Sequence, residues 1–166
     1  IAKWTTRSVL RGIGPARQSR PFRLSAVMSL QCSDAPLVSD GPQYPLQAMM
    51  LGSMFLLREV ELAGIIVDHV SLDAATQEVT IRLTSSKSDF MALGTTRTWG
   101  CICGVRTLPC PFHICSRIVA STLLSSRGHG LSEVAALGVP LFATTSFGVA
   151  TKAKFVETFE AVARLL

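Results

Sequence analysis

The order of helical and strand patterns predicts an α+β fold, a mainly helical domain with a small three-stranded antiparallel sheet. Residues 78–84 alternate apolar and polar side chains, as a half-buried strand does, between shorter strand patterns at 70–73 and 95–101. Apolar residues recur at helical spacing on both sides of these strands, at 46–57 and 111–126. With 48% hydrophobic residues in a chain of 166, one domain of this kind can bury a core.

The first 45 residues predict an irregular basic arm that precedes the domain at 46–166. Proline and glycine recur there at a density that interrupts helices and strands alike. The arm could contact phosphates through its basic side chains, or it could be a poorly ordered segment without a specific partner. Its basic residues are Lys3, Arg7, Arg11, Arg17, Arg20 and Arg23.

Within the domain, Pro45 can occupy the first turn of a helix that we expect to run to residue 57. A shorter helix follows at 59–66 and is interrupted near Gly64. The three strands are joined by a turn at 74–77 and a loop at 85–94, and Arg97 and Trp99 are expected on alternate faces of the third strand. Helices at 111–126, 131–137 and 150–166 complete the domain, and the last of them is predicted to bury Phe155, Phe159, Val162 and Leu166.

The charge balance limits the kinds of partner. A net charge of +5 and a pI near 9.3 favour an anionic partner without establishing one. No apolar run reaches the roughly 18 residues that a membrane span needs, so we expect no membrane partner. Because basic residues are scattered through the opening, we expect no signal peptide there. We therefore expect a reducing compartment, nuclear or cytoplasmic, rather than secretion.

Four of the five cysteines lie within residues 101–115. The spacing Cys101-x-Cys103-x6-Cys110-x2-His113 supplies three thiolates and an imidazole, the ligand set of a structural Cys3His zinc site. Its Cys-x-Cys pair is tighter than the usual Cys-x-x-Cys. Cys115 could replace a ligand or face the helix core. Free buried cysteines and disulfides are the alternatives to zinc, which would pin the third strand to the following helix.

Residues 56–73 read Leu-Leu-Arg-Glu-Val-Glu-Leu-Ala-Gly-Ile-Ile-Val-Asp-His-Val-Ser-Leu-Asp. They resemble the first conserved box of the tyrosine recombinases, the phage-integrase type, in which an arginine lies in a Gly-Leu-Arg-x-x-Glu-Leu context. Arg58 takes that place here. The hairpin that follows carries Lys87 in Thr-Ser-Ser-Lys-Ser-Asp and is similar to the family's catalytic hairpin. The resemblance covers about 46–166 and is strongest at 56–87.

The resemblance implies DNA breakage and rejoining, as in recombination and integration by a mobile element. It implies that Arg58 clamps the scissile phosphate and that Lys87 protonates the leaving 5′-hydroxyl. His129, in Arg-Gly-His-Gly-Leu, is similar to the histidine of the family's His-x-x-Arg box. The expected partners are double-stranded DNA, contacted by Arg58, Lys87 and Arg97, and a homo-oligomer assembled on it. From the residues alone, Arg58 could instead pair with a nearby glutamate, and Lys87 could serve solubility at a hairpin tip.

The sequence also departs from the family's pattern. Ser132 stands three residues after His129, where the second arginine would be. Phe155 is the nearest fit to the nucleophilic tyrosine, and the one tyrosine, Tyr44, precedes Arg58. Without a placed phenol no 3′-phosphotyrosine intermediate can form. We therefore expect a DNA-binding, catalytically degenerate tyrosine recombinase-like protein. The alternatives are a small zinc-stabilised interaction module without a nucleic-acid role, and a non-functional relic.

Overall fold

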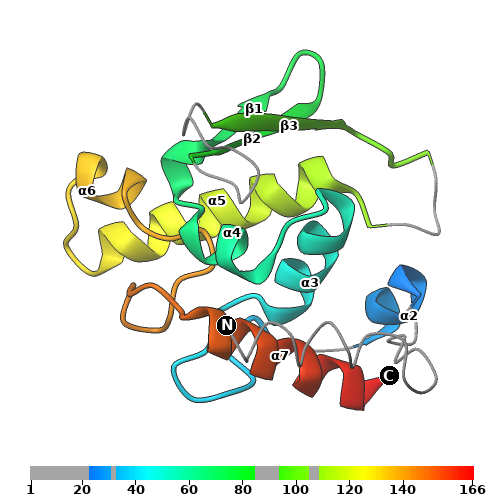
Figure 1. The fold of residues 1–166 in the computed structure, drawn as a ribbon. Coiled ribbons are helices and arrows are strands. Elements are labelled where there is room, and N and C mark those ends of the chain that lie inside the picture. Colours follow the sequence, from blue (N-terminus) through cyan, green and yellow to red (C-terminus); the bar gives the residue numbers. More distant parts are fainter. Residues whose placement is uncertain (1–22, 31–32, 85–93, 105–108) are drawn as a thin grey trace, which may run out of the picture.

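The computed structural model describes residues 23–30, 33–84, 94–104 and 109–166 of the chain. Within these ranges it contains helices and one antiparallel sheet, which confirms the α+β prediction (Figure 1). The helices are α2 (Leu24–Ser29), α3 (Pro45–Met54), α4 (Glu59–Gly64), the 3-10 helix η1 (Val67–His69), α5 (Pro111–Gly128), α6 (Glu133–Leu137) and α7 (Lys152–Leu165). The strands are β1 (Val70–Asp73), β2 (Glu78–Leu83) and β3 (Thr95–Gly100).

The sheet has the order β1-β2-β3, and both pairings are antiparallel. The central strand β2 buries Val79, Ile81 and Leu83 and turns the side chains between them away from the core. This alternation is the one that the sequence predicted for residues 78–84, and it gives the sheet a single buried face. Helix α5 runs beneath that face and contacts all three strands (Figure 1).

The core fills the space between the sheet, α5 and the remaining helices. Its largest fully buried side chains include Phe55, Phe142 and Phe155. Phe155, on α7, packs edge-to-face on Phe142 with ring centroids 6.3 Å apart, an arrangement that aromatic pairs favour. Helix α7 therefore closes the side of the domain away from the sheet (Figure 1). In the described part of the chain, no helix combines the length and apolar character needed to cross a bilayer.

A second apolar cluster joins α2 to α3 and α7. Val27 of α2 is completely buried and packs with Leu46, Met49 and Met50 of α3 and Val162 of α7. The methionines of α3 thus fill the core, a role that suits their flexible side chains. Helix α2 lies inside the segment 1–45 that was predicted to be irregular. The prediction fails at residues 24–29. Leu24 and Val27 lie three residues apart, on one side of a helix, and pack against α3.

Helix α3 ends at Met54, earlier than the predicted residue 57, in a turn that places Arg58. The N–H of Leu57 donates to the carbonyl of Gly52 at 2.8 Å, and that of Leu56 donates to Ser53 at 3.4 Å. These two bonds define a Schellman motif, whose penultimate position is normally glycine in the left-handed conformation. Here that position is Leu56, with φ of 51°. The helix was predicted too long because no glycine marks its end.

Candidate metal centre and basic site

The four predicted metal ligands meet at the corner between the sheet and α5. Cys101 and Cys103 follow the last residue of β3, and the N–H of Cys101 is held by the carbonyl of Gln77 at 2.9 Å. Cys110 is the N-cap of α5, and His113 lies in the first turn of that helix. Pro111 at the first helical position starts α5 directly after Cys110. Strand end and helix start therefore supply two ligands each.

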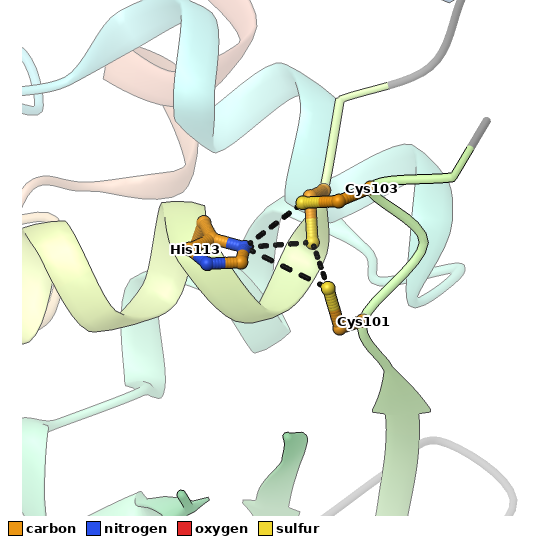
Figure 2. Close-up of side chains that lie close together, drawn as sticks. Cys101, Cys103 and His113 are labelled. Carbon is orange, nitrogen blue, oxygen red and sulfur yellow. Dashed lines mark hydrogen bonds between the residues drawn. The ribbon is translucent and has the colours of Figure 1, made fainter. Parts of the chain in front are cut away.

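The ligand atoms converge on the Nδ1 atom of His113, as Figure 2 shows for the residues it labels. This nitrogen lies 3.2 Å from Sγ of Cys103, 3.2 Å from Sγ of Cys110 and 3.8 Å from Sγ of Cys101. The sulfurs of Cys110 and Cys101 are 3.6 Å apart. All four ligand atoms lie within 4.8 Å of one another, so the cluster could hold a metal ion.

These separations lie within about half an ångström of the edges of a small coordination tetrahedron. Bond lengths of about 2.3 Å to sulfur and about 2.0 Å to nitrogen give S···S edges of about 3.8 Å and S···N edges of about 3.6 Å. A disulfide, by contrast, needs its two sulfurs about 2.05 Å apart. The sulfurs of Cys101 and Cys110, at 3.6 Å, are far outside that distance. The cluster therefore has the spacing of ligands around one shared ion.

The cluster divides its protons unequally. Burial favours the neutral thiol of Cys110, but the backbone N–H and side chain of His113 and the backbone N–H of Ile102 outweigh it and lower the pKa of Cys110 to about 6. Hydrogen bonds to Cys101 and then Cys110 raise the pKa of Cys103 to about 11. One thiolate thus forms readily at the helix N-terminus while a neighbour keeps its proton. A metal ion would displace the remaining protons, since thiolates are the ligands.

Cys115 does not belong to the cluster. Its side chain is completely buried in the core formed by α5 and the sheet. Burial, and next the charge of Cys110, raise the pKa of Cys115 to about 12, so the group is a neutral thiol. Of the two roles considered for this residue, it fills the core and does not replace a ligand.

Arg58 stands at the N-cap of α4, directly after the Schellman turn. Half of its side chain is exposed, and its Nη1 lies 3.7 Å from Oε1 of Glu61. Oε2 of the same glutamate accepts the backbone N–H of Arg58 at 2.8 Å. Glu61 is buried, so it both caps the helix and offsets the guanidinium charge. The pairing considered from the residues alone is therefore the one that forms.

A small cavity of about 40 Å³ separates α4 from the end of β2. Val60, Glu61 and Ile65 line it from the helix side, and Arg82 and Thr84 line it from the strand side. The cavity is therefore lined both by the end of the strand from which the predicted Lys87 hairpin continues and by the helix whose N-cap is Arg58. Lys87 itself lies outside the described residues.

The guanidinium of Arg97 is hydrogen-bonded to the backbone at the end of α3. Its Nη1 donates to the carbonyl oxygens of Phe55 and Leu56, the latter at 2.6 Å. Trp99 Nε1 donates to the carbonyl of Met54 at 3.0 Å. Both side chains thus reach the end of α3 from one face of β3. The expectation of alternate faces was wrong, because residues two apart on a strand point the same way.

His129 lies at the C-cap of α5, and His113 lies in the first turn of the same helix. Its Nδ1 is 2.9 Å from the carbonyl oxygen of Ser125, and its ring packs edge-to-face on Phe147 at 5.0 Å between centroids. Among the described residues, no hydrogen bond or ion pair joins His129 to Arg58. Its predicted role beside Arg58 stays a prediction.

Both positions that the sequence offered for a nucleophilic tyrosine, Tyr44 and Phe155, are buried. Tyr44 is 6% exposed, and its hydroxyl donates to Oγ of Ser121 at 2.7 Å. Phe155 is completely buried in the core. Neither position presents an open site for a nucleophile.

The positive charge of the chain is concentrated outside the described residues. Within the described ranges there are nine lysines and arginines against ten aspartates and glutamates. Six of these nine cations form ion pairs, with partners that include Asp34, Asp68 and Glu133. Five basic residues and no acidic ones lie in 1–22. The described domain is thus close to neutral, and the basic excess belongs mainly to the N-terminal segment.

Comparisons of the chain with protein-family models, with curated proteins and with solved structures give no match. Fold and site together define a small α+β domain with a Cys3His cluster that could hold a metal ion. The resemblance to tyrosine recombinases noted in the sequence at 56–87 stays a prediction.

Proposed function

We propose that the chain is a zinc-stabilised DNA-binding module of the tyrosine recombinase type that grips a phosphodiester without cleaving it. Arg58 is the proposed phosphate contact of the described domain, and Lys87 is the contact from the hairpin. Arginine suits this role because its guanidinium can bind a phosphate through two parallel hydrogen bonds. In this proposal double-stranded DNA is the partner, and a homo-oligomer assembles on it.

One observation carries the proposal: α4 and the end of β2 both line one cavity. The arginine box and the strand that leads to Lys87 are about 20 residues apart in the sequence, yet α4 and residues 82–84 line one cavity. The resemblance implies a phosphate contact made by the arginine box and the hairpin lysine together, and such charge stabilisation requires both cations to be held near one phosphate. The side chain of Arg58, at the N-cap of α4, is half-exposed, which leaves its guanidinium accessible to a phosphate.

The metal ion that suits the Cys3His cluster best is zinc. Three thiolates and one imidazole are a structural zinc set, which leaves no open position for chemistry. The spacing of Sγ and Nδ1 atoms, 3.2 to 3.8 Å to His113, supports this assignment. Zinc there would tie the end of β3 to the first turn of α5.

The absence of cleavage in this proposal follows from the tyrosine positions. The single tyrosine of these 166 residues is Tyr44, whose hydroxyl is bonded to Ser121 in the domain interior. A buried, hydrogen-bonded phenol cannot reach a phosphodiester held at Arg58, so this stretch of chain supplies no nucleophile.

Binding of a labelled double-stranded oligonucleotide, measured by anisotropy against salt, tests the proposal. The slope of log K against log salt should fall by about 0.9 for each phosphate contact that is lost. We expect that loss in Arg58→Ala and again in Lys87→Ala. Arg164→Ala is the matched control, because Arg164 is a surface cation of α7 paired with Glu160. Binding without salt dependence, or an equal loss in the control, contradicts a grip at Arg58.

A second function is favoured by the ion pair of Arg58 with Glu61. If this pair neutralises the guanidinium, the chain is a zinc-stabilised interaction module without a nucleic-acid role. The two functions differ in the effect of Glu61→Gln. Freeing the guanidinium should raise DNA affinity under the first function. Under the second, neither the wild type nor this variant binds the oligonucleotide.

A further inference from the structure

The end of α3 exposes carbonyl groups that need partners from elsewhere. The last four carbonyls of a helix have no intrahelical donor, and a Schellman motif satisfies only some of them. Here Gly52 and Ser53 accept from the turn itself. The next three carbonyls, those of Met54, Phe55 and Leu56, point toward β3.

Two side chains of β3 satisfy all three of these carbonyls. Trp99 bonds Met54, and Arg97 bonds both Phe55 and Leu56. A cation is also favoured at this end of a helix, because the helix dipole is negative there. We name Arg97 and Trp99 the clamp. The clamp joins segments about forty residues apart in the sequence and holds the turn that leads into Arg58.

The clamp lies between the metal cluster and Arg58. Trp99 precedes the ligand Cys101 by two residues, and β3 is paired with β2 along its whole length. A bound ion would fix the end of β3 through Cys101 and Cys103 and so fix the strand from which both clamp side chains project. On the other side of the clamp, Leu57 is followed directly by Arg58 at the N-cap of α4.

We propose that metal binding at the Cys3His cluster sets the position of Arg58 through Arg97 and Trp99. These two are positioning residues and do not themselves contact DNA. The consequence for DNA rests on the proposed function; the coupling between the metal and the turn does not. Arg97, which the sequence pattern offered as a DNA contact, has its Nη1 committed to two backbone carbonyls.

Two linked measurements on the full chain test the coupling. The first is zinc affinity, by competition with a chromogenic chelator, and the second is amide exchange at Leu57 by NMR in the zinc-loaded protein. Coupling between two sites is reciprocal. Arg97→Gln and Trp99→Phe should therefore weaken zinc binding by about 5-fold or more, although neither residue is a ligand.

The same variants should accelerate exchange of the Leu57 amide by a similar factor while zinc is bound. The amide of Ala136 in α6, which donates to Ser132, serves as the internal reference and should not change. Arg97→Lys keeps a donor and a positive charge at the helix end and should restore most of both effects. Thr96→Val, an exposed position of the same strand, is the matched control.

The proposal is overturned if the clamp variants bind zinc like Thr96→Val and leave the Leu57 amide unchanged. It is also overturned if Arg97→Lys is as damaging as Arg97→Gln. These measurements need no DNA, so they test the coupling even if the oligonucleotide does not bind. Failure of the oligonucleotide to bind would refute the proposed function and leave the coupling untouched.

If the chain binds DNA, Arg97→Gln should lower the salt slope by no more than about 0.9, the value for the one phosphate contact of Arg58. Added to Arg58→Ala, it should lower the slope no further. A further loss of about 0.9 would make Arg97 a direct phosphate contact and overturn its assignment as a positioning residue.

Discussion

Replacing Leu56 with glycine tests the turn before Arg58. Leu56 has φ of 51° and is 79% exposed. A residue with a Cβ pays about 1–2 kcal/mol in the left-handed region. Glycine avoids that cost but loses about 0.5–1 kcal/mol more conformational entropy on folding. We therefore expect Leu56→Gly to raise the free energy of unfolding by about 0.5–1 kcal/mol.

Urea unfolding of the zinc-saturated protein measures this change, and a thermal scan should show a rise of about 2–4 °C for each kcal/mol in a chain of this size. Leu56→Ala is the control. It removes the mostly exposed side chain but keeps the positive φ, so the free energy of unfolding should stay nearly constant. Equal stabilisation by alanine would mean that loss of the exposed isobutyl group matters and the backbone conformation does not. Destabilisation by glycine would refute the assigned turn.

Three further predictions concern the core, the pH response and the arm. Cys115→Ala should still bind one zinc ion, counted by native mass spectrometry, whereas Cys103→Ser should lose the ion. Because Cys115→Ala shortens a core side chain, it should also lower the free energy of unfolding by about 1 kcal/mol. Burial, and next the charge of Arg82, lower the pKa of His69. Protonating this histidine therefore costs more in the folded than in the unfolded chain, and the free energy of unfolding should fall as the pH drops below about 6.5. Below that pH, in urea titrations with zinc saturating, wild type should lose stability relative to His69→Gln; a constant difference would contradict this. Deleting residues 1–22 should lower the DNA salt slope by up to about 4.5, because five basic residues are lost; an unchanged slope would place the contacts elsewhere.

Local patterns in the sequence predicted the sheet and most helices. Alternation over 78–84 identified β2 because the buried face of a sheet repeats every two residues. Pro45 marked the start of α3, which begins there. The cysteine and histidine spacing predicted the metal cluster because its ligands come from the strand end and helix start that bracket one short connection.

What the sequence could not predict depends on contacts between distant segments. The clamp joins Arg97 and Trp99 to α3, and no local pattern reports such a pairing. Because Arg97 and Trp99 are two residues apart on one strand, their side chains lie on the same face. That spacing was the one signal in the sequence that could have predicted the clamp. The end of α3 was missed because Leu56 occupies a position that glycine usually marks. The pairing of Arg58 was visible as an alternative, since Glu61 lies three residues away.

Cobalt binding tests most directly the claim that the Cys3His cluster is a metal centre. Cobalt(II) can take the place of zinc, and tetrahedral thiolate coordination gives it visible absorption and sulfur-to-metal charge-transfer bands. We predict one cobalt per chain, a spectrum of three thiolates and one imidazole, and displacement by zinc. Cys110→Ser should weaken the charge-transfer bands. A spectrum of octahedral cobalt, or bands indifferent to Cys110→Ser, would contradict the account.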